Sequence, residues 1–242
     1  MAYDSSDSCR LSNQGKSSLI ESGILTAEKN MDVDQRLLAS LQEPLVRLYG
    51  FPPDSATYGY FVDPRKILTP YALKTLSLGR RPTGGGIIFH RYDAAFSILL
   101  PKEHRFFSDN TCDSYQIINA KVADVLTRFC GKKVELAHNC QTGRVSFCMA
   151  RPTQFDLTLE GKKIGGAAQR RGKQGLLHQG SVAVALPEAH YLEKLLLDGT
   201  QMAERMRRNS ASLTGEYDEG RVEEARGVLA RLFKEELGSW LA

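Results

Sequence analysis

The residues that decide the fold are Arg80-Arg81-Pro82-Thr83-Gly84-Gly85-Gly86-Ile87-Ile88-Phe89-His90. Glycine tolerates positive φ angles and lets a ligand lie directly against the backbone. Three glycines in a row leave several backbone N–H groups available to a polar or anionic group, and the two arginines add planar cations suited to phosphate. The run also fits an ordinary surface loop. The spacings of the dinucleotide-binding fingerprint and of the phosphate-binding P-loop are both absent.

The composition places the chain among globular proteins. Its 242 residues are 42% hydrophobic and 25% charged, which is enough for one large domain or two small ones. The net charge is +4 and the isoelectric point is near 8.8. Only residues 205–208 form a basic cluster, so we expect no nucleic-acid partner. The mild positive charge instead suits an acidic protein partner.

Neither a membrane nor a metal site is indicated by the sequence. No apolar run is long enough to span a bilayer, and the N-terminus lacks the basic-then-apolar pattern of a signal peptide. An odd number of cysteines without Cys-x-x-Cys spacing disfavours a zinc site and a disulfide framework; these are Cys9, Cys112, Cys130, Cys140 and Cys148. His104, His138 and His190 form no group with metal-ligand spacing. The sequence therefore predicts a cytoplasmic protein without a metal.

Local patterns predict strands and helices that are grouped along the chain. Residues 1–22, rich in Ser, Asp and Lys, are expected to be a flexible segment. Helices are predicted over Ala27–Leu41 and Pro70–Ser77, from Asp113 or Ser114 to a stop at Gly131, and over most of the chain after Glu188. Strands are predicted at Leu45–Phe51, Ile87–His90, Phe96–Leu100, Val134–Ala137, Phe155–Leu159, Lys163–Arg170 and Gly175–Leu186. Such grouping predicts an α+β fold, a mixed sheet with packed helices.

Cys148 is the residue best suited to nucleophilic chemistry. It lies in Phe147-Cys148-Met149-Ala150-Arg151-Pro152, shortly before the predicted strand at Phe155. A thiolate is a strong nucleophile, and a nearby cation lowers the pKa of a thiol. Judged by residue type alone, an intracellular cysteine is more often a small buried packing residue.

Lys163 is the second candidate, at the end of the predicted turn Glu160-Gly161-Lys162. Side chains alternate along a strand, so Lys162 and Lys163 face opposite ways and only one can point into a site. An ammonium group there could polarise an acyl carbonyl and favour a nearby thiolate. A lysine that opens an ordinary strand is instead solvated. The small residues 165–168 mark a strand on which another group packs closely.

These motifs together resemble one family. Residues 80–90 are similar to the Arg-Arg-x-Thr/Ser-Gly-Gly-Gly-x-x-x-His signature of the lipoate–protein ligase and octanoyltransferase family. Residues 148–157 resemble the Cys-Phe-x-x-Pro-(two residues)-aromatic-acidic-Leu string of its cysteine-dependent octanoyltransferases with a triple glycine. Residues 161–166 resemble Gly-(Arg/Lys)-Lys-hydrophobic-x-Gly, and residues 30–34 the Asn-Met-x-x-Asp of the family's first helix. The resemblance covers residues 27–236.

The resemblance implies a fold like the biotin/lipoate ligase catalytic domain. It implies one catalytic domain over residues 23–242, with no accessory C-terminal domain, and an acyl chain in a slot beside the glycine loop. Cys148 and Lys163 would be catalytic. The implied substrate-binding residues are Arg81, Thr83, Gly84, Gly85, Gly86, His90, Gly166, Gln179 and Gly180.

One segment departs from the family pattern. Residues 177–181 resemble a Gln-His-Gly-Ser/Thr strand with the first two residues exchanged, so His178 faces opposite to the family's histidine. We expect Gln179 to supply the hydrogen bonding of that histidine. The alternative is that His178 is a structural residue.

Four functions remain compatible with the sequence. The resemblance favours octanoyl transfer through a cysteine thioester from octanoyl-acyl carrier protein to the lysine of lipoyl domains, as in the glycine-cleavage H protein and dehydrogenase-complex acyltransferase subunits. No cofactor would be required. An ATP-dependent lipoate–protein ligase using ATP, Mg²⁺ and lipoate is the second, and transfer between lipoyl domains by the same thiol is the third. The fourth is a non-catalytic module that binds lipoyl domains or carrier protein.

Overall fold

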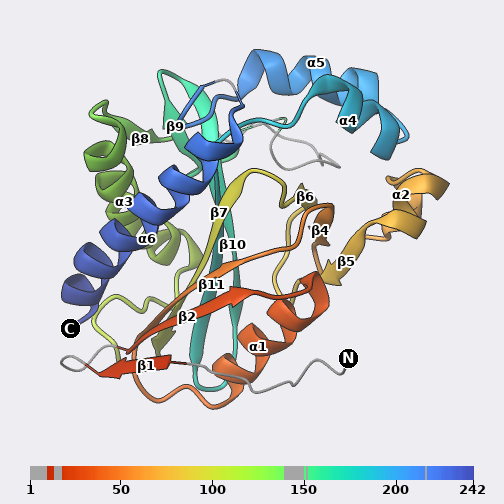
Figure 1. The fold of residues 1–242 in the computed structure, drawn as a ribbon. Coiled ribbons are helices and arrows are strands. Elements are labelled where there is room, and N and C mark those ends of the chain that lie inside the picture. The colour runs from red at the N-terminus through yellow and green to blue at the C-terminus, as the bar shows by residue number, and fades with distance from the viewer. Residues whose placement is uncertain (1–9, 14–17, 139–149, 151, 216) are drawn as a thin grey trace, which may run out of the picture.

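A computed structural model describes residues 10–13, 18–138, 150, 152–215 and 217–242 (Figure 1). Its strands form two sheets. The large one has the order β1-β2-β3-β7-β11-β10-β9-β8, and the small one has the order β5-β4-β6. The β2–β3 and β4–β5 pairs are parallel and the remaining pairs are antiparallel. Both sheets are therefore mixed, as the sequence predicted.

The strands of the large sheet are β1 (Arg10–Asn13), β2 (Ser18–Ile24), β3 (Leu45–Gly50), β7 (Asp93–Pro101), β8 (Val134–Leu136), β9 (Leu157–Leu159), β10 (Lys162–Arg171) and β11 (Gly175–Ala183). Those of the small sheet are β4 (Ser55–Tyr58), β5 (Ser77–Arg80) and β6 (Ile87–Phe89). The helices are α1 (Ala27–Ala39), α2 (Pro70–Thr75), α3 (Thr111–Cys130), α4 (Ala189–Leu195), α5 (Gly199–Asn209) and α6 (Glu219–Leu241), with a 3₁₀ turn at Pro64–Lys66.

Helices cover the large sheet on both faces (Figure 1). Helices α3 and α6 pack on one face and bury the largest apolar cluster, which includes Phe96, Leu126, Val182 and Phe233. Helix α1 packs on the opposite face against β7 and β11, and it also contacts β5 of the small sheet. This helix therefore joins the two sheets.

A second apolar cluster lies beside the small sheet. It combines Ile87 and Phe89 of β6 with Leu192 of α4 and Met202 of α5. Ala150 is fully buried in the same cluster. Ala150 thus lies in the region of the small sheet, α4 and α5.

Local chemistry explains where several helices begin and end. The Thr26 side chain accepts from the Lys29 backbone N–H at the start of α1, and Asp218 accepts from the Arg221 N–H at the start of α6. Helix α3 ends, as predicted, at Gly131, whose φ is 67°. Its start was predicted wrongly: the capping residue is Asn110, which accepts from the Cys112 N–H, rather than Asp113 or Ser114.

Other differences from the sequence prediction lie at element boundaries. Residues 10–13 and 18–22, expected to be flexible, belong to β1 and β2, because β1 pairs with β2 and β2 pairs in parallel with β3. Ser77 belongs to β5 and not to the preceding helix. The turn before β10 consists of Glu160 and Gly161, with φ of 52° and 77°, so Lys162 is already in the strand. In the part of the chain that is described, no helix has the length and apolar character needed to cross a bilayer.

Candidate active site

A cavity of about 870 Å³ lies between the small sheet, the α1 face of the large sheet and α5. Most of the site residues predicted from the sequence line this cavity, and they come from segments far apart in the chain. The lining includes Met31, Phe51, Thr57, Phe61, Lys66, Arg81, Gly85, Gly86, Ile88, His90, Thr153, Asp156, Lys163, Gly166, Gln179, Gly180, Ser181, Met202 and Arg205. Both apolar and polar groups line it, which suits a ligand with an apolar chain and a polar end.

Lys163 points into this cavity and pairs with Asp156. The Lys163 Nζ lies 2.7 Å from the Asp156 Oδ2, and both side chains are almost completely buried. The same carboxylate oxygen accepts from the Thr153 backbone N–H at 2.6 Å and the Thr153 hydroxyl at 2.8 Å. A carboxylate held by three donors is fixed in place, and it in turn fixes the ammonium group at the cavity wall.

Gly166 is what allows Asp156 to lie there. A Cβ atom on Gly166 would be 2.5 Å from the Asp156 Oδ1 and 3.3 Å from the Lys163 Cε. The strand period of two would place positions 163 and 166 on opposite faces, but the β9–β10 register shifts between Lys163 and Gly165. This β-bulge turns both residues toward the cavity.

The glycine loop (residues 82–86) is held from within by Arg81. Its guanidinium donates to the carbonyl oxygens of Gly84 at 3.0 Å and Gly86 at 2.7 Å, and to the carbonyl and hydroxyl of Thr57 at 3.0 and 2.8 Å. Arg81 is 4% exposed. The arginine predicted to suit phosphate therefore folds the loop by binding its carbonyl groups, at the edge of the same cavity.

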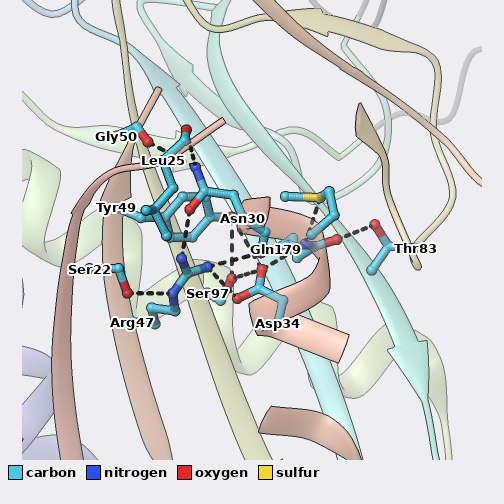
Figure 2. Close-up of polar contacts among 11 residues, drawn as sticks. Ser22, Leu25, Asn30, Asp34, Arg47, Tyr49, Gly50, Thr83, Ser97 and Gln179 are labelled. Atoms are coloured by element: carbon cyan, nitrogen blue, oxygen red, sulfur yellow. Dashed lines mark hydrogen bonds and ion pairs between the residues drawn. The ribbon is translucent and has the colours of Figure 1, made fainter. Parts of the chain in front are cut away.

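A buried chain of hydrogen bonds ties the loop to the large sheet (Figure 2). The Thr83 hydroxyl donates to the Gln179 Oε1 at 2.7 Å, and the Gln179 Nε2 donates to the Asp34 Oδ2 at 2.7 Å. Gln179 thus accepts on one side and donates on the other, as a neutral imidazole does. The expectation that Gln179 supplies a histidine's hydrogen bonding agrees with these contacts.

Asp34 is the centre of that network (Figure 2). Its Oδ1 pairs with the Arg47 guanidinium at 2.8 Å, and its Oδ2 also accepts from the Ser97 hydroxyl at 2.6 Å. Arg47 donates in addition to the Asn30 side chain at 2.6 Å, and all these groups are buried. Burial, with the nearby Asp34 charge, raises the pKa of Tyr49, so its hydroxyl stays protonated beside the network.

A second buried carboxylate, Asp93, holds His90. The His90 Nδ1 lies 2.7 Å from the Asp93 Oδ2, which also accepts from the Ser181 hydroxyl at 2.5 Å. The His90 Nε2 lies 2.7 Å from the Thr57 hydroxyl, and the ring stacks on Phe51 with centroids 3.7 Å apart. Burial alone would raise the pKa of Asp93, but its pairing with His90 and the Ser181 hydrogen bond outweigh burial and lower it.

His178 lies on the other face of the large sheet. It is fully buried next to Phe96 and Tyr115, with ring centroids 6.4 and 5.6 Å away. Its Nδ1 lies 2.9 Å from the Gln169 side-chain nitrogen. Burial lowers the pKa of His178 to about 3, so the ring is neutral. Its placement makes it a structural residue, while Gln179 enters the site.

The cavity gathers most of the residues singled out in the sequence. Lys163, Arg81, Gly85, Gly86, His90, Gly166, Gln179 and Gly180 line it. Thr83 and Gly84 are not on the wall, and they act through Gln179 and Arg81. Cys148 lies outside the described residues. Among those that are described, no group of three His, Cys, Asp or Glu side chains is arranged to hold a metal ion.

Sequence reasoning gave no role to three buried acids of the site. Asp34 and Asp156 each stand in a motif that the sequence displays, and Asp93 follows His90 by three residues. The residue type alone indicates a paired carboxylate, since an acid inside an apolar segment is buried only with partners. The sequence does not indicate which partner each acid contacts.

Comparison with known proteins identifies relatives of the chain. A family model described as the lipoyl protein ligase A/B catalytic domain matches residues 26–231. The octanoyltransferase LipM of Bacillus subtilis (strain 168) is 30% identical over 203 residues, which cover 78% of this chain and 73% of that protein. LipM of Geobacillus kaustophilus (strain HTA426) is 29% identical over 204 residues, covering 78% and 73%.

Solved structures share the fold. Lipoate-protein ligase A bound with ATP has a TM-score of 0.66 at 22% identity, covering 93% of this chain and 86% of that one. The bipartite lipoate protein ligase of Thermoplasma acidophilum, described with its E2 lipoyl domain, has a TM-score of 0.60 at 22% identity, covering 89% and 82%. The resemblance, the fold class and the place in protein lipoylation predicted from sequence are confirmed. The chain belongs to the lipoyl protein ligase A/B catalytic domain family.

Proposed function

We propose that this chain is an octanoyltransferase that uses Cys148 as nucleophile and Lys163 to stabilise the reacting carbonyl. The observation that carries the proposal is the buried Lys163–Asp156 pair on a cavity wall that also holds the glycine loop. The donor would be octanoyl-acyl carrier protein and the acceptor the lysine of a lipoyl domain. The named relatives are octanoyltransferases, and one structural neighbour is described with a lipoyl domain.

The described residues that follow Cys148 support the proposed nucleophile. Ala150, two positions later, is fully buried, and its carbonyl oxygen accepts from the Asn209 side chain at 3.0 Å. Thr153 lines the cavity and binds Asp156. Ala150 and Thr153 therefore tie the chain that follows Cys148 to the region of the cavity, which supports the proposed nucleophile.

The proposed reaction has two steps that each balance. The Cys148 thiolate attacks the thioester carbonyl carbon, a new carbon–sulfur bond forms, and the carrier thiolate leaves and takes up a proton. The neutral amine of the acceptor lysine then attacks the acyl-cysteine. A carbon–nitrogen bond forms, the nitrogen loses a proton and the Cys148 thiolate is regenerated. The Lys163 ammonium stabilises the oxyanion in both steps because Asp156 holds it in position.

The cavity wall suits an eight-carbon chain. Met31, Phe51, Ile88 and Met202 provide apolar surface, and the polar groups gather at Lys163 and Gln179. Because a thioester is already activated, the reaction would need no ATP and no metal. A reactive thiol requires a reducing compartment, which agrees with a cytoplasmic location.

Intact-protein mass spectrometry tests the proposal. We expect the protein, mixed with octanoyl-acyl carrier protein without ATP, to gain the mass of one octanoyl group. Cys148→Ala should abolish the adduct, and Cys112→Ala, which removes an exposed free thiol on α3, should leave it unchanged. An adduct that persists in Cys148→Ala would overturn the assigned nucleophile.

The second candidate is an ATP-dependent lipoate–protein ligase, which the shared glycine loop and Lys163 position also permit. Arg81 argues against a phosphate role because its guanidinium donates to the carbonyl groups of the loop. Lipoylation of a lipoyl domain that requires lipoate, ATP and Mg²⁺ and survives Cys148→Ala would establish the ligase instead.

A further inference from the structure

One rim of the cavity carries large apolar side chains that face solvent. Phe61 lines the cavity and is 91% exposed, the highest value among the large apolar residues that the structure describes. Tyr60 is half-exposed, and its ring centroid lies 5.1 Å from that of Phe61. Leu197 is also exposed, and its backbone N–H donates to the carbonyl of Ile67, a cavity residue. Exposed apolar groups gathered at a cavity are a mark of an interaction surface.

Positive charge gathers at the same rim. The guanidinium carbons of Arg80 and Arg170 lie 4.8 and 5.8 Å from the centroid of the Tyr60 ring. Lys66 and Arg205 line the cavity and are exposed. Within the described ranges, none of these four cations forms an ion pair with a carboxylate.

The acids of the cavity wall leave this positive charge in excess. Asp63 is paired with Arg65 at 2.9 Å, and Asp156 is paired with Lys163 at 2.7 Å. Asp198 is the remaining acid on the wall. One acid does not balance the four unpaired cations, so the rim attracts anions. The cation–π contacts also hold Arg80 and Arg170 on Tyr60, which lowers the entropy lost when a partner binds.

We propose that this aromatic–basic rim, formed by Tyr60, Phe61, Lys66, Arg80, Arg170 and Arg205, is the docking surface for the acyl donor. The proposal rests on the proposed function and names its partner by chemistry. That partner is an acidic carrier protein whose acyl thioester is attached through a phosphate-bearing arm. The exposed Phe61 and Tyr60 supply the apolar centre of the contact, and the cations meet the acidic surface and the phosphate.

The charge of the rim favours the donor over the acceptor. A donor arm brings a phosphate anion into the mouth of the cavity, where Lys66 and Arg205 lie on the wall. An acceptor lysine approaches from solvent as an ammonium group, which four unpaired cations repel, and it becomes the neutral amine only before it attacks. The aromatic–basic rim therefore lowers the free energy of the donor complex more than that of the acceptor complex.

Arg80→Glu is the informative change. Arg80 is exposed and does not line the cavity, so the change alters the rim and spares the site. We expect kcat/KM for octanoyl-carrier protein to fall about tenfold, chiefly through KM, since a like charge now faces the acidic partner. Turnover of a neutral octanoyl thioester of N-acetylcysteamine should not change. Arg80→Lys should restore most of the activity with carrier protein.

Arg231→Glu is the matched control, since Arg231 is an exposed residue of α6, on the side of the molecule away from the small sheet (Figure 1). It should leave both donors unaffected. An equal loss for both donors in Arg80→Glu, or a loss seen only in the KM for the lipoyl domain, would overturn the donor assignment.

Direct binding separates this proposal from the proposed function. Calorimetric titration with holo-carrier protein at low salt should detect binding to the unaltered chain and to Arg231→Glu, and clearly weaker binding to Arg80→Glu. Absence of transfer from either thioester would reject the octanoyltransferase, whatever the titration gives. Equal binding by Arg80→Glu and the unaltered chain would reject the docking surface alone.

Discussion

His178 and Gln179 are adjacent on β11, yet they belong to two different environments. His178 faces the α3–α6 side, where it is neutral and surrounded by aromatic rings. Gln179 faces the α1 side, where it joins Thr83 of the glycine loop to the buried Asp34. One face of the sheet is closed by apolar packing, and the other keeps buried charges paired around a cavity. The apolar face is thus held by close packing, and the polar face holds the polar side chains of the cavity in position through paired charges.

The largest effect is expected from removal of the Lys163 ammonium group on the polar face. Lys163→Ala should lower kcat about a thousandfold, because it removes the charge that stabilises the oxyanion. Lys162→Ala is the matched control, since Lys162 is exposed at the start of the same strand. Steady-state kinetics with an octanoyl thioester makes the comparison. Equal losses in the two variants would contradict the assigned orientation of β10.

Asp34→Ala should cost about 4 kcal/mol of unfolding free energy, because it leaves the fully buried Arg47 without its carboxylate. Lys133→Ala, which breaks the exposed pair with Glu135, should leave stability unchanged. Urea unfolding measures both variants. A stable Asp34→Ala protein would mean that the network is dispensable for the fold.

The apolar face is tested by Gly180→Ala. A Cβ atom there would lie 2.1 Å from the Phe96 Cζ, so the ring must move within a packed core, at a cost of about 2 kcal/mol. Gly227→Ala on α6 is the control, because nothing lies within 4 Å of its Cβ position. That change should be neutral or slightly stabilising. Thermal unfolding that shows the reverse order would refute the packing around β11.

The effect that is smallest near neutral pH concerns the charge state of His178. Its pKa is about 3 in the folded protein and near 6.5 when unfolded, so the unfolded state takes up a proton first. The unfolding free energy should be unaffected above pH 6.5 and should fall by about 1.4 kcal/mol per pH unit below it, until about pH 3. His178→Gln should remove this part of the slope. If denaturant titrations at several pH values give the same slope for His178→Gln and the unaltered protein, folding does not lower the pKa of His178.

Sequence periodicity determined the fold class, the positions of the main helices and most of the strands. The resemblance of residues 80–90 and 161–166 to family motifs singled out the glycine loop, Lys163 and Gly166. The alternation of side chains correctly separated His178 from Gln179. Those inferences are local, since they depend on neighbours along the chain.

The tertiary structure alone decided which partner each buried charge has. Asp34 meets Arg47 from 13 positions away and Gln179 from 145 positions away, and no pattern along the chain encodes such distances. The bulge that turns Lys163 and Gly166 to the same side results from pairing with β9 and breaks the simple period. Arg81 donates to the carbonyl groups of Thr57 and Gly86, which the pairing of β4 with β6 brings close together. Burial makes partners obligatory, and the packing of distant segments selects them.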